Sequence, residues 1–126
     1  MSRKEISSNY LTAVGPYSLA VETDGLVFFS GQIPLNPETG KLVEGDVKIQ
    51  TEQIFTNLSH LLGDAGLTLD DVQKTTVFLT DMNDFPVMND VYKNQFSKPY
   101  PARSTISVNA LPLGSKVEIE IIARRR

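Results

Sequence analysis

Arg103 is the residue whose type and position most directly suggest binding chemistry. It follows Pro101 and Ala102 and stands where a strand is predicted to begin. A guanidinium presents a planar fork of N–H donors that matches a carboxylate at two points. One charged hydrogen bond of this kind contributes about 1.5–3 kcal/mol. Arg103 is therefore a candidate for holding an anionic group, although a solvated surface arginine fits the same pattern.

Two glutamates on the last predicted strand are candidates for proton transfer. Side chains alternate along a strand, so Glu118 and Glu120 share one face while Val117, Ile119 and Ile121 share the other. A carboxylate shielded from bulk water can position a water molecule and move a proton. Pairing with a cation on a neighbouring strand is the alternative, and the alternation does not choose between the two glutamates.

Two short motifs flank the first predicted hairpin. They are Gly15-Pro16-Tyr17 and Ser30-Gly31-Gln32-Ile33-Pro34. Gly31 has no Cβ, so a ligand can approach its backbone closely, and Tyr17 offers a hydroxyl to the same space. Ordinary turn formation also accounts for both motifs, so neither predicts a site by itself.

Composition restricts the classes of chemistry and of partner. The 126 residues correspond to one domain over 1–126, and the absence of cysteine excludes disulfides, thiolate metal sites and cysteine nucleophiles. With one histidine and no phosphate-binding or dinucleotide-binding motif, we expect neither a metal nor a cofactor. Lys and Arg number 12 against 15 Asp and Glu, so the net charge of −3 disfavours nucleic acid as a partner despite the three arginines at 124–126. No leader or membrane span is recognised, and we expect a cytoplasmic protein.

Apolar periodicity predicts strands and helices in the order β-β-α-β-α-β-β. The strands are expected over 17–22, 26–30, 72–80, 104–111 and 116–123. The helices are expected over about 46–64 and from Asp84 to the residues before Pro99, with Asn57 and His60 on the wet face of the first helix. This order predicts an α+β fold, in which two helices pack on one face of a mixed sheet.

The second face of that sheet is expected to be covered by another subunit. Two helices cannot cover both faces of five strands, and we expect Arg103 and Glu118 to lie on the face without helices. The stretch 26–29 is nevertheless apolar on both sides, which predicts burial on both faces. We therefore expect an oligomer, arranged as a closed ring.

Five motifs together resemble the YjgF/RidA family over about residues 15–123. Besides the two motifs beside the hairpin, they are Lys74-Thr75-Thr76-Val77-Phe78 with Asp81-Met82-Asn83-Asp84-Phe85, Pro101-Ala102-Arg103-Ser104 and Val117-Glu118-Ile119-Glu120. The resemblance implies a chorismate-mutase-like α+β fold and a homotrimer with sites between subunits. It also implies hydrolysis of reactive 2-enamine and 2-imine acids, such as 2-iminobutanoate and 2-iminopropanoate, to 2-oxo acids and ammonia.

The resemblance assigns roles residue by residue. Arg103 matches the arginine that binds the substrate carboxylate, Glu118 matches the carboxylate that orients water, and Tyr17 joins them as a catalytic residue. The positions that match substrate-binding residues are Ser30, Gly31, Asn89, Ser104 and Thr105. Thr105 departs from members that carry cysteine there. Two other classes of function remain open at this stage, an RNA-binding protein or endoribonuclease and a metabolite-binding regulatory protein.

Overall fold

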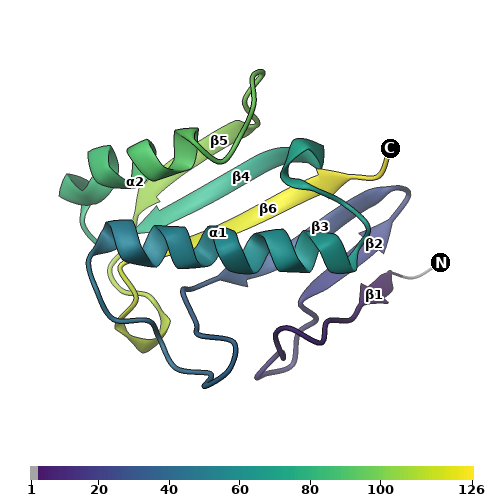
Figure 1. Cartoon of the computed structure of the whole chain (residues 1–126), viewed down its shortest axis with the longest axis horizontal. Coiled ribbons are helices and arrows are strands. Elements are labelled where there is room, and N and C mark those ends of the chain that lie inside the picture. The colour runs from purple at the N-terminus through teal and green to yellow at the C-terminus, as the bar shows by residue number, and fades with distance from the viewer. Residues whose placement is uncertain (1–2) are drawn as a thin grey trace.

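The computed structural model describes residues 3–126, which form one six-stranded sheet with two helices on one face (Figure 1). The strands are β1 (Lys4–Ile6), β2 (Ala20–Thr23), β3 (Leu26–Gln32), β4 (Val72–Leu79), β5 (Ala102–Ser107) and β6 (Val117–Arg124). The helices are α1 (Val47–Asp64) and α2 (Phe85–Lys93). The predicted α+β class, mixed sheet and one-sided helix layer are confirmed.

The strand order across the sheet is β1-β2-β3-β6-β4-β5. β4 and β5 run parallel because α2 carries the chain back between them, whereas all other neighbours are antiparallel. β1 was not predicted, since it is only three residues long and carries little apolar periodicity. The expected strand at 104–111 instead spans Ala102–Ser107, which makes β5 a short strand at the edge of the sheet.

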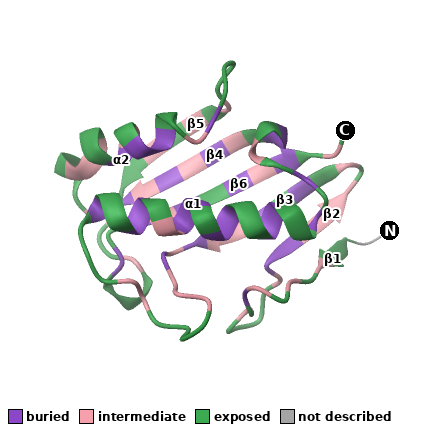
Figure 2. Cartoon of the chain, in the orientation of Figure 1, coloured by how far each residue is buried: buried purple, intermediate pink, exposed green. Residues whose placement is uncertain are grey.

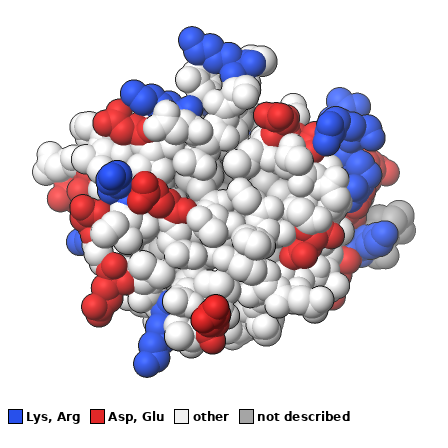
Figure 3. Space-filling view, in the orientation of Figure 1, with Lys and Arg blue, Asp and Glu red and all other residues white. Residues whose placement is uncertain are grey.

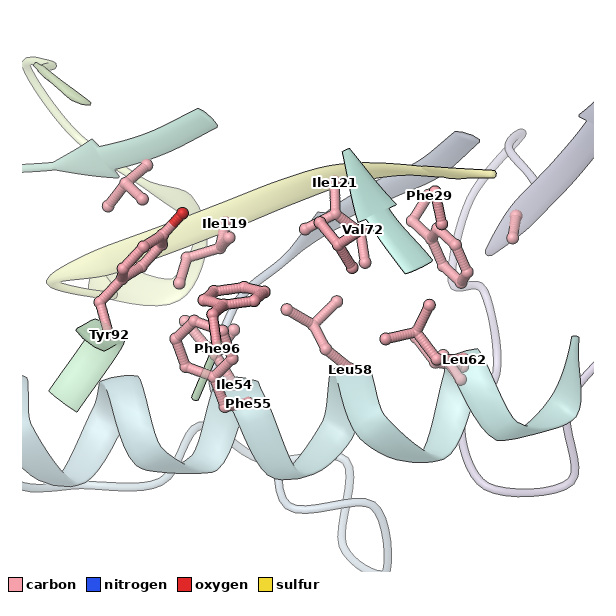
Figure 4. Packing of buried hydrophobic residues seen from close by; sticks show 14 of the residues in the cluster. Phe29, Ile54, Phe55, Leu58, Leu62, Val72, Tyr92, Phe96, Ile119 and Ile121 are labelled. Carbon is pink, nitrogen blue, oxygen red and sulfur yellow. The ribbon is translucent and has the colours of Figure 1, made fainter. Parts of the chain in front are cut away.

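Helix α1 supplies most of the apolar layer under the sheet. It begins at Asp46, whose side chain accepts a hydrogen bond from the Ile49 N–H at 3.0 Å. One side of the helix is buried along its length (Figure 2), and Leu58 and Leu62 point toward Ile121 and Phe29 of the sheet (Figure 4). Burying a side chain of this size contributes about 1.5–3 kcal/mol.

Helix α2 is held against β4 and α1 by aromatic side chains. Phe55 of α1 packs edge-on against Tyr92 and Phe96, with ring centroids 5.8 Å apart in each pair. The Tyr92 hydroxyl shares a 2.7 Å hydrogen bond with the buried Thr75 hydroxyl of β4. These contacts fix the position of α2 beside the edge strand β5.

The expectation that Asn57 lies on a wet helix face is wrong. The segment before β2 packs against that side of α1, and Asn57 is fully buried. Its amide accepts a hydrogen bond from the Tyr10 hydroxyl at 3.0 Å and donates one to the Leu35 carbonyl at 2.8 Å. His60 is exposed as expected, and its ring stacks on Tyr10 with centroids 3.8 Å apart.

The sheet face without helices carries several partly exposed apolar side chains. In the single chain Val27 and Phe29 are buried beneath the helices, while Leu26 and Phe28 are each 37% exposed on the opposite face. Ile106 on β5 is 45% exposed. Coverage of this face by another subunit therefore stays a prediction. No described helix is long and apolar enough to cross a membrane.

Candidate functional site

Arg103 lies on the helix face of the sheet, which corrects the prediction that it lies on the opposite face. It pairs in register with the buried Thr75, and its Nη1 donates a 2.7 Å hydrogen bond to Oδ1 of Asn89 on α2. Its guanidinium carbon lies 4.6 Å from the ring centroid of Tyr92 and 5.4 Å from that of Phe85. The edge strand β5 therefore places Arg103 beside α2, where the Asn89 amide and two aromatic rings stabilise the guanidinium.

Thr105 lies on the same face of β5 as Arg103, two residues further along. Its hydroxyl oxygen is buried and has no hydrogen-bond partner among the described residues. Leaving such a group unpaired costs about 1–3 kcal/mol, so a ligand that completes the hydrogen bond would recover that free energy. We call Phe85, Asn89, Tyr92, Arg103 and Thr105 the arginine cluster.

The arginine cluster has unused hydrogen-bonding capacity. Arg103 forms no ion pair with a carboxylate of residues 3–126, and its one recorded hydrogen bond goes to Asn89. The predicted role of Ser104 finds no support in this cluster, because its exposed side chain alternates to the opposite face, beside Thr76. The cluster can therefore offer several N–H donors and one hydroxyl to an anion.

A pocket of about 540 Å³ lies around Glu118, away from the arginine cluster. Tyr17, Ser30, Gly31 and Glu118 all line it, so the structure brings together four of the residues predicted for the site. The Ser30 hydroxyl donates to the Ser18 carbonyl at 2.6 Å and the Ser30 N–H donates to the Leu19 carbonyl at 3.0 Å. These bonds hold the segment that carries Tyr17 against the end of β3. We call this space the glutamate pocket.

Gly31 makes room for the Glu118 carboxylate. A Cβ at position 31 would lie against a carboxylate oxygen of Glu118 and 3.0 Å from its Cδ, closer than ordinary van der Waals contact. The register between β3 and β6 also shifts between Phe29 and Gln32, so the backbone at Gly31 departs from the regular ladder. Any residue other than glycine would displace the carboxylate from its position.

Glu118 is a partly buried carboxylate without a counter-charge. Burial raises its pKa above the ordinary carboxyl value, and the nearby charge of Glu120 raises this pKa further. Its cross-strand neighbour on β4 is Phe78, and it has no ion-pair partner within residues 3–126. The cation-pairing alternative for Glu118 is therefore unsupported, and a raised pKa suits a group that both accepts and donates a proton.

The arginine cluster and Glu118 lie on opposite faces of the sheet in one chain. Val117 and Ile119, which flank Glu118, are fully buried beneath the helices, so Glu118 points the other way.

The sequence analysis did not identify Phe85 and Tyr92 as members of the arginine cluster. Their spacing from Asn89, four residues before it and three after it, is the helical signal that places all three on one side of α2.

Three comparisons place the chain among known proteins. A family model described as Endoribonuclease L-PSP matches residues 7–125. The chain is 48% identical over 126 residues to Protein DfrA of Myxococcus xanthus, covering 98% of this chain and 96% of that protein. It is 48% identical over 122 residues to 2-iminobutanoate/2-iminopropanoate deaminase of Mus musculus, covering 96% of this chain and 90% of that protein. The crystal structure of E. coli TdcF with bound serine matches with a TM-score of 0.91 at 42% identity, covering 98% of this chain and 99% of the TdcF chain.

This chain belongs to the YjgF/RidA family. The predicted membership is thereby confirmed, as is the chorismate-mutase-like α+β fold of the chain.

In this RidA-family chain two of the three C-terminal arginines are held in ion pairs. Arg125 contacts both carboxylate oxygens of Glu22, at 2.9 and 2.8 Å, and Arg126 lies 2.8 Å from Asp71. Both acidic and basic side chains occur on the face drawn in Figure 3. The ion pairs with Glu22 and Asp71 offset the charges of Arg125 and Arg126.

Replacing Glu118 should stabilise the folded protein at neutral pH. Below the ordinary carboxyl pKa, Glu118 is protonated in both the folded and the unfolded chain. As the pH rises above that value, the unfolded chain ionises first, so stability is lost until the raised pKa of the folded state is passed. Glu118→Gln avoids this loss, and we expect its Tm to exceed that of the wild type at pH 7 and to approach it at pH 4.

Thermal unfolding at both pH values is the measurement, with Glu52→Gln on the exposed side of α1 as the matched control. A Tm difference that does not change with pH, or an equal gain in the control, would contradict the assignment.

Proposed function

We propose that this protein hydrolyses 2-imino and 2-enamino acids, such as 2-iminobutanoate and 2-iminopropanoate, to 2-oxo acids and ammonia. The observation that carries the proposal is Glu118, an unpaired and half-buried carboxylate of raised pKa in a pocket beside Gly31 and Tyr17. The name of the mouse relative, at 48% identity, supports the same activity.

Glu118 would act as the acid and base of the hydrolysis. It accepts a proton from a water molecule as the water oxygen bonds to C2 of the protonated imine, which yields a tetrahedral intermediate. It then returns that proton to the nitrogen. The C2–N bond breaks, the hydroxyl proton leaves with ammonia as ammonium, and a 2-oxo acid remains. Proton transfer by a positioned group contributes about 10²–10⁴-fold to the rate.

The arginine cluster would hold the substrate carboxylate. Arg103 is anchored at Nη1 by Asn89 and stacked against two rings, so its remaining N–H groups are pre-oriented at little entropic cost. The buried Thr105 hydroxyl would supply one further hydrogen bond. The serine bound in the E. coli TdcF crystal structure is itself an amino acid with a carboxylate, which supports an amino-acid-like ligand.

The proposed reaction requires two subunits for each site. Arg103 and Glu118 lie on opposite faces of one sheet, so one copy cannot place both around the same small molecule. We infer a homotrimer in which the arginine cluster of one subunit meets the glutamate pocket of the next. The partly exposed Leu26, Phe28 and Ile106 on the face without helices support such an assembly.

Loss of Arg103 should remove most of the proposed activity. Deleting one charged carboxylate contact of 1.5–3 kcal/mol predicts a fall in kcat/KM of about 10- to 100-fold for Arg103→Ala. A threonine dehydratase supplies 2-iminobutanoate, and the rate of 2-oxobutanoate release is compared with and without the protein. Lys93→Ala removes an exposed cation of α2 and is the matched control.

Unchanged activity of Arg103→Ala would contradict the carboxylate role. Binding of 2-oxobutanoate by the wild type without any acceleration of imine decay would favour a metabolite-binding protein instead.

Glu118 and Glu120 should behave differently in the same assay. We expect Glu118→Gln to lower kcat by about 10²–10⁴-fold, because the proton acceptor is lost. Glu120→Gln should retain the activity, but the acidic limb of its pH–rate profile should move to lower pH, because the charge of Glu120 raises the pKa of Glu118. An inactive Glu120→Gln beside an active Glu118→Gln would reverse the assignment.

A further inference from the structure

Leu113 has an unusual backbone and an unusual exposure for a leucine. It lies in the short turn Pro112–Gly114 before β6, with φ 58° and ψ 17°, in the left-handed region that favours glycine. Its side chain is 68% exposed and lines the glutamate pocket. An apolar side chain in a strained backbone conformation is a reason to look for a functional role.

The turn that carries Leu113 is firmly anchored beside the first turns of α1 (Figure 1). The Lys116 N–H donates to Oε1 of the buried Gln50 at 2.9 Å, and the Gln50 side chain donates to the Val43 carbonyl at 3.1 Å. The buried Ser115 hydroxyl donates to the Val117 carbonyl at 2.7 Å. The position of Leu113 at the pocket is therefore fixed by the residues that follow it in the chain.

Leu113 continues an apolar wall of the glutamate pocket. The other apolar side chains that line the pocket are Leu11, Val14, Leu19, Ile33, Leu35 and Pro112. Polar atoms come from residues that include Tyr17, Ser30 and Glu118. In a 2-imino acid, C2 carries a carboxylate, a nitrogen and the side chain of the parent amino acid. The polar groups of the site fit the first two substituents, which leaves the apolar wall for the third.

We propose, resting on the function proposed above, that Leu113 is a specificity-determining residue that contacts the substrate side chain. The contact favours 2-imino acids with longer aliphatic side chains, such as those formed from leucine, over those formed from alanine. Each methylene group held in an apolar pocket changes kcat/KM by about tenfold or more, so one leucine contact is enough to set a preference.

The test is the ratio of kcat/KM for the leucine-derived imine to that for the alanine-derived imine. A D-amino-acid oxidase with catalase generates each imine, and semicarbazide trapping measures its decay with and without the protein. Leu113→Gly removes the side chain and suits the backbone, while Leu113→Asn keeps a side chain that tolerates φ > 0 but is polar. Asp24→Gly is the matched control, because Asp24 has φ 52° in the β2–β3 turn and does not line the pocket.

We expect the leucine-to-alanine ratio to fall about tenfold in both Leu113 variants and to keep its wild-type value in Asp24→Gly. Thermal unfolding should show Leu113→Gly at least as stable as the wild type, since glycine relieves the strain of a leucine at φ 58°. If the wild type accelerates both imines and the Leu113 variants leave the ratio unchanged, the specificity proposal is overturned and the proposed function stands. If the wild type accelerates neither imine, both are overturned.

Discussion

Alternation of side chains across a β-sheet is the constraint on which the rest of this structure depends. A side chain in a strand points to one face or the other, and this rule places Arg103 beneath α2 and Glu118 on the opposite face. The guanidinium of Arg103 and the carboxylate of Glu118 are therefore separated by the thickness of the sheet. A reaction that needs both must use two copies of the chain, and the partly exposed apolar face is the surface on which a second copy would pack.

Each half of the site is shaped by a different part of the fold. The aromatic contacts of Phe55, Tyr92 and Phe96 hold α2 in place, and α2 in turn presents Asn89 to Arg103. On the other face, the register shift in β3 and the missing side chain of Gly31 leave space for Glu118. Burial of this carboxylate disfavours its charged form, so the fold gives up some stability to raise the pKa of the group proposed to move protons.

The sequence predicted the elements better than their faces. Continuous apolar periodicity defined α1 and β6, and those predictions are confirmed. β5 also alternates, with Ile106 on one side and Arg103 and Thr105 on the other, and its apolar side was expected to face the helices. In the structure Ile106 is 45% exposed on the open face while Arg103 contacts α2, so Arg103 was assigned to the wrong face. Asn57 was misplaced because a segment distant in sequence covers it. The left-handed backbone of Leu113 has no sequence signal, since leucine does not favour that conformation.

The central claim, that a site consists of Arg103 from one subunit and Glu118 from another, is tested most directly by mixing two inactive variants. Arg103→Ala and Glu118→Gln are refolded together in equal amounts, and native mass spectrometry verifies that mixed oligomers have formed. In a trimer each mixed ring contains one intact site, so random mixing predicts recovery of about a quarter of the wild-type imine-hydrolysing activity. Verified mixed rings that remain inactive would contradict the shared site.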